Sequence, residues 1–400
     1  MKKNIFLSIR SIGLKTRNSL IPTGIALSMI LFSMNLQAQF GSPVVSPEIL
    51  PDNQVTFRLF APEAATVSVN GEWMEMGQSQ DLVRNDTGLW SATLGPLEPE
   101  FYGYSFYVDG VQVPDPSNPL IKRDGVRIAN ELLIRGQQSE LYAVNNVPHG
   151  TLSKVWYDSP TLGLERRMYV YTPPGYENSK EDYPVLYLLH GGGGDEDAWT
   201  TLGRANYIMD NLIAQGRIVP MVVVMTNGNP DQAAAPGARP PETNEQQGPA
   251  GGMGSGLFEK SLINDVIPYI ESHYQVLTDR AHRALTGLSM GGLQTLNLSE
   301  NYPEMFDYYG VMSMGLMDMS NMGVPPNENL DQQIETLKNS GYKLYWIGVG
   351  KDDFLYESVV NLRQKLDEHN FKYLYRESTG GHEWANWRIY LSEFAPMLFK

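Results

Sequence analysis

The stretch Gly287-Leu288-Ser289-Met290-Gly291-Gly292 decides the fold, because it places a serine between two glycines in the pattern G-x-S-x-G. A short apolar run, Ala284-Leu285, precedes it, and a segment compatible with a helix follows it up to Tyr302-Pro303. A strand, a sharp turn and a helix in this order are typical of a nucleophile elbow, which lifts the serine hydroxyl clear of the backbone. A side chain at either glycine would collide with neighbouring chain in so tight a turn. The pattern alone is common by chance, so its meaning depends on the rest of the sequence.

Segments with the character of strands and helices alternate on both sides of this stretch. The apolar runs Val185–Leu189 and Met221–Met225 predict strands buried on both faces. Residues 258–274 carry apolar side chains at helical spacing, despite Pro268. Further strands are expected at 167–171, 309–312, 344–349 and 373–376, and further helices at 208–215 and 358–369. This alternation predicts a mostly parallel sheet covered by helices on both faces.

The region before the α/β pattern reads differently. Val55–Phe60, Thr66–Val69 and Tyr102–Val108 alternate apolar and polar residues, and turn signals such as Asn70-Gly71 and Asp109-Gly110 separate them. Short strands at this spacing predict an all-β, immunoglobulin-like sandwich over residues 42–145. We therefore expect two domains, the sandwich and an α/β domain over residues 150–400.

Residues 1–38 have the pattern of a secretory signal peptide. A basic stretch that ends at Arg17 precedes an apolar run from about Ile21 to Leu36, and Gln37-Ala38 offers a small residue at a plausible cleavage point. Pro22 and Gly24 interrupt the apolar run, which argues against a transmembrane anchor. We expect a secreted or periplasmic protein without membrane association after cleavage of the signal.

The bulk composition excludes several classes of protein. The net charge is −15, and it becomes −20 without the five basic residues of the signal segment (Lys2, Lys3, Arg10, Lys15 and Arg17). An acidic surface argues against nucleic acid and anionic membranes as partners. The chain has no cysteine, which excludes disulfides, thiolate zinc sites and a cysteine nucleophile. No metal or cofactor motif is present, and Asp195-Glu196-Asp197 is interpreted as a solvated loop rather than a cation site.

A serine nucleophile needs a base and an orienting acid, which in this class of fold follow it in the order acid, then histidine. Only His369 and His382 follow Ser289. His369 ends an amphipathic helix, where a structural role is expected, whereas His382 lies in a glycine-flanked loop after the last strand. We therefore expect His382 to be the base. The acid should follow strand 344–349, where Asp352 and Asp353 are both candidates, and the spacing does not choose between them.

Negative charge on the acyl oxygen needs backbone N–H donors. The amide of Met290, next to the serine, is one candidate. The loop His190-Gly191-Gly192-Gly193-Gly194 directly follows the strand Val185–Leu189 and should supply the other, with His190 supporting the loop. Four independent pieces thus fall in the required order along the chain.

These motifs, with Phe258-Glu259-Lys260, Gly350-Lys351-Asp352-Asp353-Phe354-Leu355 and Gly381-His382-Glu383-Trp384, resemble carbohydrate esterase family one over residues 150–400. These are the esterase-D-like feruloyl and acetylxylan esterases, which have the α/β-hydrolase fold. The resemblance implies a catalytic set of Ser289, Asp353 and His382, because family members carry the acid immediately before the Phe. It also implies an oxyanion site formed by Met290 and a residue near Gly192, and no cofactor.

The N-terminal region is similar to the early-set sandwich of family forty-eight carbohydrate-binding modules, on the evidence of Phe57-Arg58-Leu59-Phe60-Ala61-Pro62 and Trp90–Leu94. Starch-binding relatives use exposed tryptophans. In this chain Trp73 and Trp90 could bind sugar or could belong to the core. The segment 229–256, rich in Gly and Pro, is expected to be a lid, a binding loop or a disordered insertion.

The resemblance implies a secreted serine esterase that removes feruloyl groups from plant cell-wall arabinoxylan, with feruloylated or acetylated xylan and xylo-oligosaccharides as partners. Trp199, Tyr356 and Trp384 lie near the site motifs and are expected to bind the substrate. The alternatives are an acetylxylan esterase or an esterase for a siderophore lactone or a thioester. Outside the enzymes, the alternative is a glycan-binding protein whose hydrolase domain only presents a surface.

Overall fold

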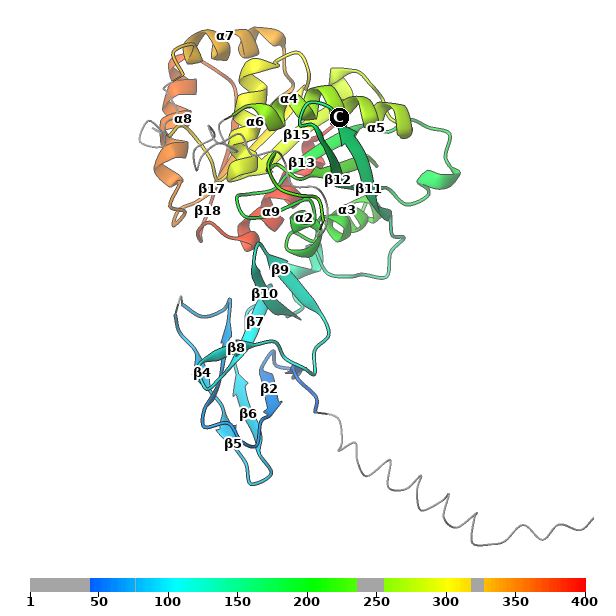
Figure 1. Cartoon of the computed structure of the whole chain (residues 1–400). Coiled ribbons are helices and arrows are strands. Elements are labelled where there is room, and N and C mark those ends of the chain that lie inside the picture. Colours follow the sequence, from blue (N-terminus) through cyan, green and yellow to red (C-terminus); the bar gives the residue numbers. More distant parts are fainter. Residues whose placement is uncertain (1–43, 76, 236–254, 318–326) are drawn as a thin grey trace, which may run out of the picture. The chain divides into compact units, whose positions relative to one another are not determined.

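The predicted elbow strand, β15 (Arg283–Leu288), lies inside an eight-stranded sheet in the computed structural model of the chain (Figure 1). The structure describes residues 44–75, 77–235, 255–317 and 327–400. In spatial order the strands are β11 (Thr151–Ser159), β12 (Leu164–Thr172), β14 (Val222–Thr226), β13 (Val185–Leu189), β15, β16 (Tyr308–Met312), β17 (Leu344–Gly350) and β18 (Leu374–Ser378).

Pairing in this sheet is parallel from β14 to β18, and antiparallel only where β11 and β12 join. Every residue of β13, β14, β15 and β16 is buried. Full burial of a strand requires cover on both faces of the sheet. The mostly parallel, two-sided sheet predicted from the apolar runs is therefore confirmed.

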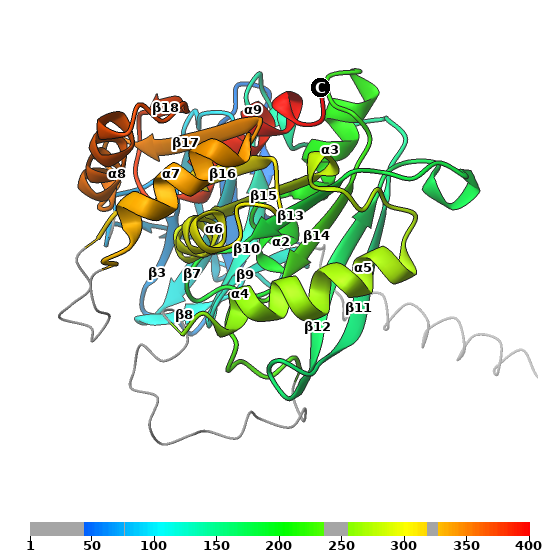
Figure 2. The same cartoon turned by 90° about the horizontal axis from the view of Figure 1, so that it is seen from above.

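Helices cover both faces of the sheet (Figure 2), and the sheet separates the hydrophobic core into two clusters. Leu186 and Leu188 of β13 lie in one cluster with side chains of α3 (Ala205–Ala214) and α9 (Trp384–Phe394), which cover that face of the sheet. Tyr187 and Leu189 point to the opposite cluster, because successive side chains of a strand alternate between its faces. The helices on that second face are α4 (Leu257–Ser261), α5 (Ile267–His273), α6 (Met290–Asn301), α7 (Leu330–Ser340) and α8 (Tyr356–Glu368).

The helix predicted over residues 258–274 is present, but it is not uniform. It consists of α4, a π-helical turn (η3, Leu262–Val266) and α5. Pro268 lies in the first turn of α5. A proline is tolerated in the first turn of a helix, and the π-helical turn before it marks the interruption in the regular hydrogen-bond ladder.

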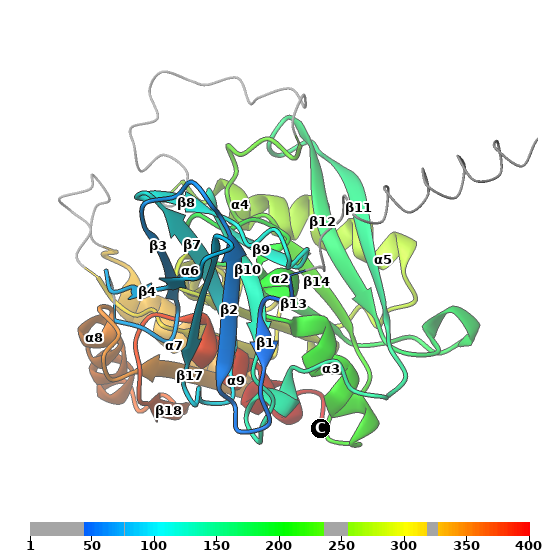
Figure 3. The same ribbon diagram turned by 90° about the horizontal axis from the view of Figure 1, so that it is seen from below.

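The predicted sandwich consists of two antiparallel sheets (Figure 3). The first sheet contains β1 (Glu48–Ile49), β2 (Val55–Phe60), β6 (Leu89–Leu94) and β5 (Val83–Arg84). The second contains β4 (Gln80–Asp81), β3 (Val67–Gly71), β7 (Phe101–Val108), β10 (Arg127–Leu133) and β9 (Ile121–Asp124), and β8 (Val111–Val113) pairs with β7. The three strands predicted in this region are β2, β3 and β7, so the all-β prediction is confirmed.

The two tryptophans considered for sugar binding pack in the sandwich. Trp90 is 8% exposed, and its indole N–H donates to the Ala61 carbonyl oxygen at 2.8 Å. Trp73 stacks on Phe57 with a centroid distance of 5.5 Å and meets the edge of Tyr102. Both tryptophans therefore belong to the packing of this region.

The sandwich and the α/β region belong to one compact unit, Ser46–Lys400. A buried ion pair joins them, because Arg388 of α9 donates to a carboxylate oxygen of Glu100 at 2.8 Å. Tyr142 donates to the same oxygen at 2.6 Å. Removing one partner would leave the other charge buried without a partner, at a cost of about 3–5 kcal/mol. We propose the domain boundary at 145–150, since β11 begins at Thr151.

Two predictions concern residues that lie largely outside the described part of the chain. The signal peptide predicted at 1–38 lies wholly outside it, and the segment 229–256 is described only at 229–235 and 255–256. Within the described ranges, none of the helices combines the length and the apolar character needed to cross a bilayer.

Candidate active site

Ser289 occupies the sharp turn between β15 and α6, as the motif predicts. Its backbone has φ +51° and ψ −116°, a conformation that is rare for any residue with a side chain and that costs about 1–3 kcal/mol. A Cβ at Gly287 would lie 2.4 Å from the Gly291 backbone, and a Cβ at Gly291 would lie 2.7 Å from the carbonyl oxygens of Leu189 and His190. Both glycines are therefore required by close approach of the backbone.

His382 and Asp353 lie side by side after the last two strands. The Nδ1 atom of His382 is 3.0 Å from each carboxylate oxygen of Asp353. Asp353 is 4% exposed, whereas Asp352 is exposed and makes no hydrogen bond to His382. The structure thus pairs the histidine with the acid that the resemblance favours. Since the carboxylate can only accept, Nδ1 carries the proton and Nε2 is the nitrogen left for Ser289.

Hydrogen bonds keep Asp353 ionised in spite of its burial. Burial alone would raise the pKa of Asp353, but hydrogen bonds from His382, the Leu355 amide and Ser313 outweigh it and lower the pKa below its usual value. The Leu355 N–H donates to Oδ1 at 2.9 Å. A charged, fixed carboxylate is the partner that orients an imidazole and stabilises its protonated form.

Two aromatic rings hold the imidazole of His382. The ring of Phe354 lies 4.5 Å from it, and the ring of Trp387 meets it edge-on at 4.9 Å. The Trp387 indole N–H donates to Ser313 Oγ at 2.9 Å, which fixes the tryptophan in turn. The rotamer of the histidine is therefore determined by packing as well as by Asp353.

The glycine loop after β13 lies directly against the elbow. A Cβ on Gly191 would lie 3.3 Å from the Cβ of Ser289, whereas a Cβ on Gly192 would meet no atom within 4 Å. Gly192 thus borders open space beside the serine. Met290 is the first residue of α6, so its amide belongs to the helix N-terminus, which favours negative charge.

His190 supports this loop, as expected. Its Nε2 accepts from the Gly228 N–H at 2.8 Å, so Nδ1 carries the proton and donates to the Gly191 carbonyl oxygen at 2.7 Å. Burial lowers the pKa of His190. The imidazole is therefore neutral, and it bridges the glycine loop to the residues after β14.

The interpretation of Asp195-Glu196-Asp197 as a solvated loop is wrong. Asp195 and Glu196 are buried, and all three carboxylates have basic partners. Arg123 of the sandwich pairs with Asp195 and Asp197, and the Arg167 Nε lies 2.5 Å from Glu196. Ion pairs with residues far along the chain anchor the loop, and a local sequence pattern does not reveal them.

A cavity of about 170 Å³ brings the candidate residues together. It is lined by Asp124, Gly191, Gly192, Gly194, Ala198, Leu288, Ser289, His382, Trp384 and Trp387. Trp384 and Trp387 of α9 and three glycines of the glycine loop all contribute to its walls. The cavity holds the serine, the histidine and the predicted oxyanion residue Gly192 around one space.

Two of the three aromatic residues expected to bind substrate lie elsewhere. Trp199 is only 1% exposed, and its indole N–H donates to the Leu189 carbonyl oxygen, so it packs beneath the site. Tyr356 donates its hydroxyl to Glu377 and does not line the cavity. Trp384 does line it, and it meets Trp199 edge-on. Proximity in sequence to the motifs could not separate a residue that supports the cavity from one that faces it.

Sequence reasoning missed several residues of the site. Ser313, which bonds Trp387, carries no motif, although its φ of +51° marks another unusual turn at the end of β16. Asp124 reaches the cavity from the sandwich, which no pattern in residues 150–400 could indicate. Within the described residues, no group of three or more histidine, aspartate or glutamate side chains is placed to hold a metal ion.

Comparison with known proteins agrees with this description. Residues 159–398 match a family model described as "Putative esterase", and residues 39–119 match carbohydrate-binding module 48, the isoamylase N-terminal domain. An endo-1,4-beta-xylanase/feruloyl esterase of Xylanibacter ruminicola is 32% identical over 365 residues, which cover 88% of this chain and 46% of that protein. The chain therefore spans less than half the length of this relative.

Solved structures share the fold. A ferulic acid esterase of Anaeromyces mucronatus, in complex with ferulic acid, has a TM-score of 0.55 and 24% identity, over 66% of this chain and 96% of that one. The enterobactin esterase of Shigella flexneri has a TM-score of 0.61 and 16% identity, over 90% of this chain and 97% of that one. The expected α/β-hydrolase fold is confirmed. The chain therefore belongs to the esterase family, whose enzymes hydrolyse carboxylic esters, and it carries an N-terminal region that matches carbohydrate-binding module 48.

Proposed function

We propose that the chain is a secreted serine esterase that releases feruloyl groups from plant cell-wall arabinoxylan. The observation that carries the proposal is one arrangement: Ser289, on a strained turn, shares a cavity with His382, and His382 is bonded to the buried carboxylate of Asp353. Nucleophile, base and orienting acid in this relation are the components of acyl transfer through serine.

In the first half of the reaction, Ser289 Oγ attacks the ester carbonyl carbon while His382 Nε2 removes its proton. Asp353 stabilises the imidazolium that forms. The amides of Met290 and Gly192 donate to the oxyanion of the tetrahedral intermediate, and each such donor is worth about a hundredfold or more in rate. Collapse of the intermediate breaks the bond to the sugar oxygen, which takes the proton from His382, and leaves an acyl-serine.

In the second half, water replaces the sugar. His382 removes a proton from the water as it attacks the acyl-serine, and then returns that proton to Ser289 Oγ as the carboxylic acid leaves. The enzyme is restored after one ester and one water have been consumed. This scheme needs no metal or cofactor.

The cavity walls favour an aromatic acyl group over acetyl. Trp384 and Trp387 present two indole rings beside Ser289 and His382. Flat aromatic groups gain by packing against such rings, whereas an acetyl group would leave most of that surface without contact. The similarity to the xylanase/feruloyl esterase supports the same choice. We also propose that the sandwich contacts the polysaccharide, which its match to a carbohydrate-binding family supports.

The test is to incubate insoluble arabinoxylan with the protein and to identify the released acids by mass. The expected result is ferulic acid from the wild type, and a loss of about 10⁴-fold or more for Ser289→Ala. Release of acetic acid alone would favour an acetylxylan esterase. Binding to xylan without hydrolysis of any ester would favour the glycan-binding alternative. Equal release by the wild type and Ser289→Ala would contradict the mechanism.

A further inference from the structure

The turn between β9 and β10 of the sandwich reaches the proposed catalytic cavity. Asp124, the last residue of β9, lines this cavity together with Ser289 and His382. Gly125 follows it with φ +59°, and a Cβ there would lie 2.9 Å from the carbonyl oxygen of Gly193. The tip of the hairpin therefore lies against the glycine loop that carries the proposed oxyanion donor.

Arg123 holds this tip in place. Its guanidinium pairs with Asp195 and Asp197, which follow the glycine loop, and it also donates to the Gly125 carbonyl oxygen at 3.1 Å. A planar guanidinium with several donors is suited to fixing two carboxylates and a carbonyl at once. The position of Asp124 beside the cavity is thus determined by three contacts of its neighbour.

Asp124 also lines a second cavity, on the sandwich, of about 660 Å³. The walls of this cavity include the polar side chains of Glu72, Gln112, Lys122 and Arg127. The catalytic cavity, at about 170 Å³, is too small to hold an acyl group and a sugar chain together. A polysaccharide attached to the ester must leave it, and the cavity that shares Asp124 offers a polar path.

The carboxylate of Asp124 is available for a ligand. Among the described residues it takes part in no hydrogen bond or ion pair, whereas its neighbours Lys122 and Arg123 are both paired. An ionised carboxylate only accepts hydrogen bonds, and it can accept from two hydroxyls at once. Vicinal hydroxyls of a sugar are donors of this kind.

We propose that Asp124 is a substrate-binding residue, which accepts hydrogen bonds from hydroxyls of the sugar that carries the ester. The proposal rests on the proposed function, and it assigns the aromatic wall of α9 to the acyl group and the hairpin tip to the sugar. Specificity for the sugar side of the substrate is then supplied by the sandwich. A hydrogen bond to a charged group affects affinity by about 10- to 100-fold, so its loss is measurable.

The test compares two substrates that share the acyl group. Methyl ferulate has no sugar, whereas a feruloylated arabinoxylan oligosaccharide presents sugar hydroxyls next to the ester. For Asp124→Ala, kcat/KM on the oligosaccharide should fall about 10- to 100-fold more than kcat/KM on methyl ferulate, because only the oligosaccharide can lose hydrogen bonds from its sugar. Asp124→Asn keeps one acceptor oxygen and should give an intermediate loss. Asp86→Asn, in the exposed turn between β5 and β6, is the matched control for charge.

The outcomes separate the two proposals. If Asp124→Ala lost the same factor on both substrates, or lost nothing on the oligosaccharide, the assignment of Asp124 to the sugar would be wrong while the esterase proposal stood. If the wild type hydrolysed neither substrate, the esterase proposal and this inference would fail together. Thermal unfolding of each variant identifies a loss that arises from misfolding.

Discussion

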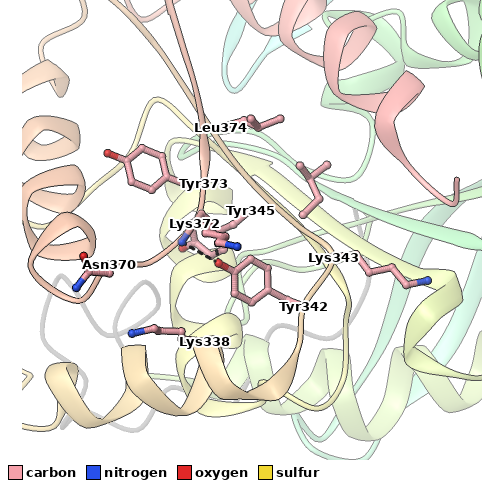
Figure 4. Close-up of a pocket in the computed structure, with 9 residues that line it drawn as sticks. Lys338, Tyr342, Lys343, Tyr345, Asn370, Lys372, Tyr373 and Leu374 are labelled. Carbon is pink, nitrogen blue, oxygen red and sulfur yellow. Dashed lines mark hydrogen bonds between the residues drawn. The ribbon is translucent and has the colours of Figure 1, made fainter.

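The eight-stranded sheet has one cavity at the carboxyl ends of its strands and another at their amino ends, and the two differ in character. The cavity at the carboxyl ends of the strands is small, about 170 Å³, and it contains the strained Ser289 and the pair His382–Asp353. The cavity at the amino ends of β17 and β18 is larger, about 490 Å³, and is lined by lysines and tyrosines, among them Lys338, Tyr342 and Lys372 (Figure 4).

Polar groups at the amino-end cavity are used by the fold itself. Lys338 Nζ donates to the His369 carbonyl oxygen at 2.6 Å, and the Tyr342 hydroxyl donates to the Lys372 carbonyl oxygen at 2.6 Å. Tyr342 also stacks on Phe371 with a centroid distance of 4.7 Å. At the carboxyl end, by contrast, Ser289 and His382 line the cavity, and among the described residues neither the serine hydroxyl nor Nε2 of His382 has a hydrogen-bond partner. We infer that polar groups without a hydrogen-bond partner and a strained backbone, rather than cavity volume, mark the site of chemistry.

Among variants that keep Ser289, the largest effect is expected for Asp353→Asn. The amide cannot hold the imidazole in the tautomer that leaves Nε2 unprotonated, so kcat should fall about 10³- to 10⁴-fold. Initial rates on methyl ferulate measure this loss. Asp352→Asn, one residue away and exposed, is the matched control and should stay within about twofold. A reversed order of the two variants would contradict the assignment.

A smaller loss is expected for Arg123→Gln, because Arg123 acts through the glycine loop. Without the guanidinium, the buried Asp195 loses its basic partner and the loop with Gly192 shifts, which should lower kcat about 10- to 100-fold with little change in KM. The loss should be equal on methyl ferulate and on a feruloylated oligosaccharide.

Two further variants show whether the loss of kcat in Arg123→Gln arises from a misplaced glycine loop or from general destabilisation of the fold. Arg123→Lys keeps the charge and should recover part of the loss in kcat. Arg84→Gln, at an exposed position of the sandwich, should change neither kcat nor stability appreciably. A rise in KM with kcat unchanged, or an equal loss for Arg84→Gln, would rule out the positioning role.

At the other end of α6 from Ser289, Glu300 should affect stability without affecting catalysis. Burial raises the pKa of Glu300 to about 7, although a hydrogen bond from Asn327 opposes this. The folded state therefore keeps a proton that the unfolded chain loses, so stability is full below about pH 4.5 and falls as the pH rises through 7.

Glu300→Gln should therefore be more stable than the wild type at pH 8, by about 2 kcal/mol, with the difference shrinking towards pH 5. Urea unfolding at the two pH values measures it. Glu304→Gln, exposed nearby, is the control. Equal pH dependence of Glu300→Gln and the wild type would contradict this account.

The smallest effect is expected at the amino-end cavity. Tyr342→Phe removes the hydrogen bond to the Lys372 carbonyl oxygen and should lower the free energy of unfolding by about 1 kcal/mol, with activity within twofold of the wild type. A tenfold loss of kcat/KM on methyl ferulate would mean that this cavity serves the reaction, and the distinction between the two cavities would then be wrong.

Local sequence patterns predicted the strands and helices whose side chains are uniformly buried or clearly divided into a buried and an exposed face. The apolar runs of β13 and β14 could be recognised because both faces of these strands are buried. The edge strand β11 was missed, since most of its residues are exposed and no continuous apolar run marks it. The helices α7 and α9 were missed too. In α9, polar residues such as Asn386 and Arg388 are buried among aromatic ones, which obscures the amphipathic pattern.

In the candidate site, too, residues with a local sequence signature could be predicted, and residues that depend on distant partners could not. Ser289, His382 and the glycine loop could be predicted because tight turns and strand ends leave local signatures in glycine and in chain order. The partners of the glycine loop could not be predicted, because Arg123 lies 72 residues before Asp195 and belongs to the sandwich. Trp199 was misplaced because burial depends on what packs above a residue, which its sequence neighbours do not encode.

Ser289, the strained serine at the carboxyl ends of the strands, is the nucleophile that we propose. The most direct measurement is mass spectrometry of the protein after reaction with a fluorophosphonate, followed by peptide mapping. If Ser289 is the nucleophile, we expect one adduct, on the peptide with Ser289, loss of esterase activity in proportion to labelling, and no adduct in Ser289→Ala. Full labelling of another residue, or full activity in protein labelled at Ser289, would contradict it.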